Sequence, residues 1–229
     1  MRLSVFWLAG AFSLAGCGLF GKSSESVTPE QLAKIPPDQM GPVNQARAEL
    51  QKAQEEVSRT DQALKSSQNE VNVANEQMNV VKAQIDATKA LLTKANFDNN
   101  SAEGQKALRQ QTMNQAQQEV AQAQFKAADA GVDLWKAQKR EAEAQRDLAQ
   151  AKLDLTAGEA LKAIGDPAGK NMNIDSMRAK VEERLKDVES ARNDATKLQT
   201  EVERQRMTLD TANQHLNELR GQGGGPSPR

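Results

Sequence analysis

The sequence contains few of the side chains that fill a wide protein core. Tyrosine is absent, and aromatic residues make up 3% of the 229 residues. Hydrophobic residues account for 38%, and alanine is the commonest of them, so large apolar side chains are scarce. A compact enzyme core needs such side chains. A composition rich in Ala, Glu, Lys, Leu and Gln is instead typical of long helices and coiled coils.

The residues that usually carry chemistry are equally scarce. The chain has one cysteine and one histidine, His215, too few for the four Cys or His ligands of a structural zinc site or for a catalytic triad. The position three residues before His215 is Ala212, so the Glu-x-x-His pair of a di-iron bundle is missing as well. We therefore expect no enzymatic activity, no cofactor and no metal, and we interpret His215 as a solvated helix residue.

Charge of one sign is not in excess, since 30 Lys and Arg face 31 Asp and Glu. This balance lacks the strongly basic signature of a nucleic-acid binder, and we expect no nucleic-acid partner. Charge runs along the chain are interpreted as solvated helix faces.

The chain starts with a short targeting pattern. Arg2 is followed by a mostly apolar run over residues 3–14. About twelve apolar residues fit the central region of a signal peptide and fall short of the ~20 that span a bilayer. Residues 1–16 are therefore predicted to be a signal peptide.

The tetrapeptide Leu14-Ala15-Gly16-Cys17 resembles the lipobox of bacterial lipoproteins. The resemblance implies that Leu14, Ala15 and Gly16 are recognised by the signal peptidase, and that Cys17 is acylated and becomes the new N-terminus. It also implies sorting to the outer membrane, because Gly18 stands where an aspartate favours retention at the inner membrane. In a cell without an outer membrane, the anchor would lie in the outer face of the cytoplasmic membrane. The alternative is an ordinary secretory signal with an incidental cysteine.

Residues 17–42 contain four of the seven prolines and three glycines. This composition predicts a lipidated cysteine followed by a flexible tether. A short helix within it can begin at Pro29, with Thr28 as its cap.

A heptad repeat begins at residue 43. Apolar residues recur every seven positions, and a second, mostly small residue follows each after three places. Such a seam indicates a left-handed coiled coil, and its small residues favour close helix packing. The larger members of this first seam are Val43, Leu50, Val57, Leu64, Val71, Met78, Ile85 and Leu92.

Two further seams follow, over residues 113–158 and 174–219. In the second seam every small position is Ala or Gly, so Gly158 is expected to mark a close approach of another backbone. Pro167 and two glycines end this helix within 164–174, and Asn173 or Asp175 can cap the next one. The Gly- and Pro-rich segment 220–229 is predicted to be a disordered tail.

The segment 96–101 interrupts the first two seams with Asn and Asp, which favour turns. We expect a hairpin turn at 97–100. Because both seams share one heptad phase, a single continuous helix is the alternative. The candidate contact residues at the tip of the hairpin are Phe97, Asp98, Asn99 and Asn100.

The predicted fold class is all-α. The simplest arrangement is an elongated antiparallel coiled coil, an up-down-up three-helix rod over residues 43–219. Its helices would cover about 43–96, 101–163 and 175–219, with lengths of about 80, 95 and 70 Å at 1.5 Å per residue. Short connections favour antiparallel neighbours.

Three other features have competing interpretations. The loop at 165–170 lacks the spacing and the Ser or Thr of a phosphate loop, and we interpret it as a helix stop. Glu141 and Arg184 fall on seam positions, either as long side chains that reach water or as a buried polar pair. Trp135 either covers the edge of the bundle or anchors a partner.

These features predict a structural or interaction protein, a lipid-anchored coiled coil in the bacterial periplasm. An accessory or adaptor subunit of an export or efflux system, or a chaperone-like clamp, is the alternative. The expected partners are the membrane, through lipid on Cys17, and a protein or a second copy, through the helix faces. We expect no covalent link to peptidoglycan, because the Braun-type murein lipoprotein uses a C-terminal lysine and this chain ends at Arg229.

Overall fold

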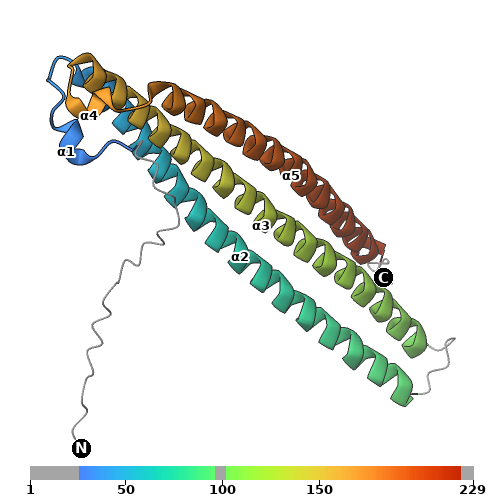
Figure 1. Cartoon of the computed structure of the whole chain (residues 1–229). Helices are drawn as coiled ribbons and strands as arrows, with labels where there is room; N and C mark the ends of the chain where they lie inside the picture. The colour runs from blue at the N-terminus through green and yellow to red at the C-terminus, as the bar shows by residue number, and fades with distance from the viewer. Residues whose placement is uncertain (1–25, 96–101, 223–229) are drawn as a thin grey trace, which may run out of the picture.

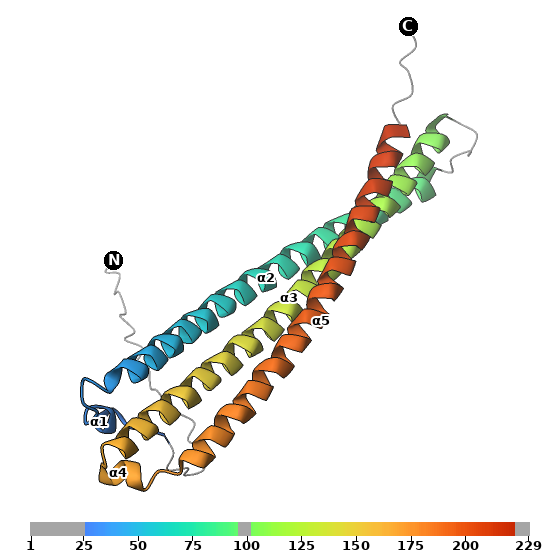
Figure 2. The same cartoon turned by 90° about the horizontal axis from the view of Figure 1, so that it is seen from above.

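The computed structural model describes residues 26–95 and 102–222, which form helices joined by loops. The long helices are α2 (Met40–Ala95), α3 (Ala102–Ala163) and α5 (Ile174–Gln222), and the short ones are α1 (Pro29–Leu32) and α4 (Pro167–Lys170). Figure 1 shows α3 lying between α2 and α5. Figures 1 and 2 both place α1 and α4 together at one end of the long helices. The prediction of an all-helical fold of long packed helices is confirmed.

The end that carries α1 and α4 is called the base here. It comprises these two helices and the adjoining parts of the long helices, residues 40–50, 153–164 and 172–177. The remainder of the long helices is called the shaft.

The seam registers of α2 and α5 are those predicted from the heptads. Every predicted seam position from 43 to 92 in α2, and from 174 to 219 in α5, is buried or half-buried. Most other positions on these helices are exposed. The seven-residue repeat therefore identified which face of each helix packs against a neighbour.

Helix α3 has a second contact face that the sequence analysis did not predict. Ala116 and Ala137 of the predicted seam are buried, but Ala121, Val132 and Ala142 outside it are buried too. The reason is topological, because α3 packs against both α2 and α5. A single heptad seam forms one contact face, and one face can pack against only one of these two helices.

Ion pairs and hydrogen bonds fix how α2 lies on α3. Lys139 Nζ lies 2.7 Å from Asp61 Oδ1, and Asn114 Nδ2 donates to Thr88 Oγ1 at 2.8 Å. The later residue of α2 pairs with the earlier residue of α3, so the two helices run in opposite directions. The alternative of one continuous helix through 96–101 is therefore wrong, although the predicted turn itself lies outside the described residues.

The break between α3 and α5 is built by local backbone chemistry. Gly165 adopts a φ of 73°, which glycine reaches without strain. The Asp166 side chain accepts from Ala168 N at 2.8 Å at the start of α4. Asn173 caps α5, since its Oδ1 accepts from Ser176 N at 3.0 Å. The interpretation of this loop as a helix stop is confirmed, and Asn173 rather than Asp175 is the cap.

Two glycines allow close packing at the base. A Cβ built on Gly169 would lie 2.4 Å from the backbone carbon of Leu161. A Cβ on Gly158 would lie 3.0 Å from Met177 Sδ, so the nearest neighbours at that position are side chains of the α4–α5 region and not the backbone that was expected.

The described part of the predicted tether differs from the expectation of a flexible linker. Thr28 caps α1 in a capping box, in which Thr28 N donates to Gln31 Oε1 at 2.8 Å and Gln31 N donates to Thr28 Oγ1 at 3.3 Å. Leu32 and Ile35 are buried in the base core, and α2 already begins at Met40. Apolar residues between the prolines thus cover the end of the bundle. Residues 17–25 lie outside the described part.

Candidate functional site

The residues of the predicted lipid site and tip are not among those that the structure describes. Cys17 and the preceding Leu14, Ala15 and Gly16 lie before residue 26. Phe97, Asp98, Asn99 and Asn100 lie within 96–101. Lipidation and contacts at the tip therefore stay predictions.

The described residues offer no metal centre, since they hold no group of three or more His, Cys, Asp and Glu side chains placed to bind an ion. The His215 side chain is 51% exposed, as predicted for a solvated helix residue, and its Nδ1 lies 3.3 Å from Glu119 Oε2. This contact joins α5 to α3 across the surface of the shaft.

Glu141 and Arg184 do not form a pair with each other. Glu141 Oε1 accepts from Arg192 Nε at 3.2 Å and thereby links α3 to α5. Arg184 pairs with Asp187 of its own helix at 2.8 Å. Both side chains reach the surface, in agreement with the slender-bundle interpretation. Trp135 is half-buried, and its indole nitrogen donates no hydrogen bond to another of the described residues.

Asp61 carries the most connected ion pair between α2 and α3. Hydrogen bonds from Lys139 and Lys65, reinforced by the charges of these lysines, lower the pKa of the Asp61 carboxyl. The same contact with Asp61 raises the pKa of Lys139. Both groups are in contact with solvent, as in an ordinary surface ion pair. The pair links α2 to α3 and helps to set their alignment.

Among the described residues, Asp154 is the one ionisable residue that is buried. Its Oδ1 accepts from Val27 N at 3.3 Å and from Gln150 Nε2 at 3.1 Å. Burial raises the pKa of Asp154, opposed by these hydrogen bonds and by the charge of Lys180. The carboxyl therefore connects the segment before α1 to α3 at the base.

A groove between α2 and α5 lies along part of the shaft, over residues 66–84 of α2. Within the described helices, α2 and α5 both pack on α3, and no comparable packing joins α2 to α5. The space between them forms two hollows of about 490 and 480 Å³, which share Val73 and Gln124 in their linings. The predicted rod is therefore open along one side.

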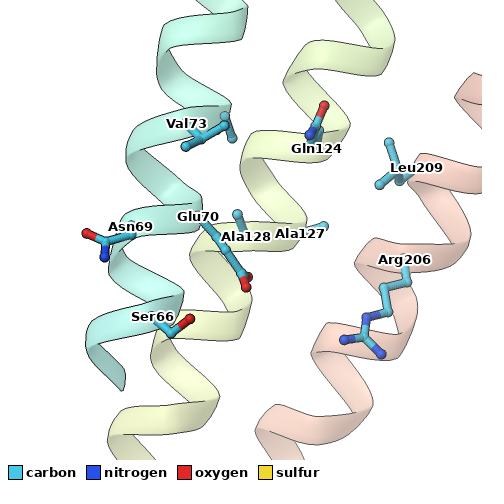
Figure 3. A pocket seen from close by; sticks show the side chains of 10 residues that line it. Ser66, Asn69, Glu70, Val73, Gln124, Ala127, Ala128, Arg206 and Leu209 are labelled. Atoms are coloured by element: carbon cyan, nitrogen blue, oxygen red, sulfur yellow. The ribbon is translucent and has the colours of Figure 1, made fainter. Parts of the chain in front are cut away.

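The groove has an apolar interior with charges on its walls. Val73 and Val80 from α2 are 52% and 57% exposed within it. Leu209 and Leu216 line it from α5, and Gln124 lies on its α3 floor. Figure 3 shows Glu70 and Val73 on one side of α3 with Arg206 and Leu209 on the other. Such a surface fits a helix better than a small polar molecule.

A sequence signal for this groove existed in α2. Val73, Val80 and Leu91 are spaced by seven and eleven residues, which puts them on one helix face outside the first seam. All three are more than half exposed in the structure. The dominant heptad of α2 concealed this second stripe.

No protein-family model, no curated protein and no solved structure matches this chain. Its functional assignment consequently depends on its own residues and geometry.

Proposed function

We propose that this chain is a lipid-anchored coiled-coil protein of the bacterial cell envelope, with a structural or interaction role. Acylated Cys17 anchors it to the outer membrane, and the helical shaft extends into the periplasm. The observation that carries the proposal is the tetrapeptide Leu14-Ala15-Gly16-Cys17 behind a short apolar run. Two or more acyl chains give stable anchoring, since each buried CH₂ contributes about 0.8 kcal/mol.

The up-down-up course of the rod is part of the proposal. Its support is the order of contacts, because Glu141 lies against Arg192 and Glu119 against His215, as for antiparallel neighbours. In this arrangement the base lies nearest the membrane, and the α2–α3 connection lies at the far end.

The helical part is suited to presenting surfaces. Among the described residues, no helix combines the length and the apolar character needed to cross a membrane. The exposed groove on the shaft offers a contact surface over residues 66–84 of α2 and the parts of α3 and α5 beside them. These features support an interaction role over an enzymatic one.

Metabolic labelling tests the anchor. Bacteria that express the wild-type chain with an alkyne-labelled palmitate should yield a labelled protein in the outer-membrane fraction. Cys17→Ser should lose the label and the membrane association. Labelled Cys17→Ser, or an unlabelled wild-type chain released into the periplasm, would contradict the proposal and indicate an ordinary secretory signal.

Gly18→Asp is the matched variant for the sorting step. It should keep the label, because Cys17 is unchanged, and move the protein to the inner-membrane fraction. If the labelled variant stays in the outer membrane, the sorting part of the proposal is wrong and the lipidation part stands.

A further inference from the structure

The groove carries an apolar stripe without a covering element. Val73 and Val80 are more than half exposed on the α2 wall. On the α5 wall opposite them, Leu209 is half-buried and Leu216 is 6% exposed. The hollows that these residues line continue along the helices. A continuous apolar strip on a long helix is a characteristic docking surface for another helix.

The charges on the two walls have opposite signs. Glu70 and Glu76 line the groove from α2, whereas Arg206 lines it from α5. None of these three makes an ion pair among the described residues. Figure 3 shows Glu70 and Arg206 on facing sides of α3, within the same hollow. Within the first hollow, Glu70 on the α2 wall therefore stands across from Arg206 on the α5 wall.

We propose that a second copy of this chain covers the groove, in a parallel dimer whose two-fold axis runs along the shaft. Rotation about that axis turns the second groove towards the first and exchanges the two walls. The α2 wall of each copy then faces the α5 wall of the other at equal height. Glu70 meets Arg206 of the second copy twice, and the exposed Val73 and Val80 of one copy approach the half-buried Leu209 of the other.

The opposite orientation of the second copy is disfavoured by the same charges. A two-fold axis perpendicular to the helices would place α2 against α2 and α5 against α5. Glu70 and Glu76 would then approach the same acidic residues of the second copy. Like charges brought together in an interface oppose association, so the charge pattern selects the parallel dimer.

This dimer goes beyond the proposed anchoring, because it does not depend on lipid. The test uses the full chain with Cys17→Ser in every sample, which removes both lipid and thiol, in density-matched detergent. Self-association is measured by sedimentation equilibrium, and circular dichroism checks that each variant is helical.

Glu70→Arg and Arg206→Glu should each weaken self-association by about tenfold or more, since each substitution makes both wall contacts repulsive. An equimolar mixture of the two variants should recover the affinity of the unsubstituted chain. In the mixed dimer, Arg at position 70 meets Glu at 206, and native Glu70 meets native Arg206. A contact within one chain would not recover on mixing.

A second pair of variants tests the apolar stripe. Val80→Asp should also weaken the dimer by about tenfold or more, because it puts a charge into the closed interface. Met207→Asp is the control, since Met207 is 63% exposed and does not line either hollow.

Three results would overturn the inference. The chain could stay monomeric up to about 100 µM, which would leave the groove to a helix of another protein. Mixing could fail to restore affinity. Glu70→Arg could strengthen association, which would indicate α2 against α2. Lipid labelling of the native chain is independent of all three, so either proposal can fail while the other stands.

Discussion

At the base, Leu161 and Met177 are enclosed by side chains from several helices, whereas along the shaft the long helices touch through Ala74, Thr60 and Ser67. The base core combines large apolar residues from the segment before α2, from α3 and from the start of α5. The shaft buries mostly alanine and small polar side chains between pairs of helices, with separate larger residues such as Ile85, Leu148 and Leu216. Contacts between small side chains remove little apolar area from water. They therefore contribute little to the free energy of unfolding, because apolar stabilisation grows with the buried area.

The enclosed core lies at the base of this molecule, and the accessible surface lies on the shaft. The base closes on itself because α1 and α4 cover the ends of the long helices. The shaft leaves one side of α3 uncovered, and that side forms the groove. Substitutions in the two regions should therefore differ in their effect on stability.

Leu161→Ala should cause the largest loss. Leu161 is fully buried in the base core, and removing a buried leucine side chain costs about 2–5 kcal/mol through lost burial and the cavity that is left. Urea unfolding followed by circular dichroism measures the change in the free energy of unfolding.

Leu108→Ala is the matched control for that variant. Leu108 is exposed on α3 in the shaft, and a surface change of this kind should alter stability by no more than about 0.5 kcal/mol. Equal losses for the two variants would show that the base is no more tightly packed than the shaft.

Asn114→Ala tests the polar contacts of the shaft. Asn114 is buried, its Nδ2 donates to Thr88, and its Oδ1 accepts from Gln110 Nε2 at 3.0 Å. Loss of these bonds should lower the free energy of unfolding by about 1 kcal/mol, because net contributions of single hydrogen bonds are small. The exposed Gln115→Ala, one residue away, should have almost no effect. A loss as large as that of Leu161→Ala would contradict the contrast between the regions.

Asp154→Asn should cause the smallest change in the free energy of unfolding, and this change should depend on pH. The pKa of Asp154 is raised in the folded state by burial, so the folded protein binds this proton more tightly than the unfolded chain does. Its contribution to stability is therefore fully present below the ordinary pKa of about 3.8 and is lost as pH rises through the raised value. Asparagine keeps the oxygen that accepts from Val27 and Gln150 but does not ionise.

Urea unfolding at pH 3 and at pH 7 measures this effect. The stability of Asp154→Asn relative to the wild type should increase from pH 3 to pH 7. The exposed Asp133→Asn should show no such increase. A relative decrease for Asp154→Asn would mean that the ionised carboxylate, through Val27 N–H and Lys180, stabilises the base.

Much of the helical organisation could be predicted from the sequence. The heptads identified the packed faces of α2 and α5, and Asn173 and Thr28 were recognisable as caps because their side chains suit an N-terminal backbone. The second face of α3 was not predicted, because alanine suits both a seam and an exposed helix face. Its burial at Ala121 and Ala142 depends on which helices lie beside it.

The groove shows the same limit. The seven-residue spacing of Val73 and Val80 can be recognised in the sequence. That spacing does not determine whether another helix of the same chain covers the two side chains.

The all-helical class, the packed faces of α2 and α5 and the breaks between the long helices could be derived from the sequence, because they depend on local propensity, periodicity and capping. The sequence also contains the lipobox-like tetrapeptide on which the anchoring proposal depends. Three features could be seen only in the folded chain: α3 lies between its neighbours, residues 27–40 close the base, and one side of the shaft is open. These features depend on which surfaces, distant in sequence, pack against the same apolar residues. No local pattern in the sequence determines that choice.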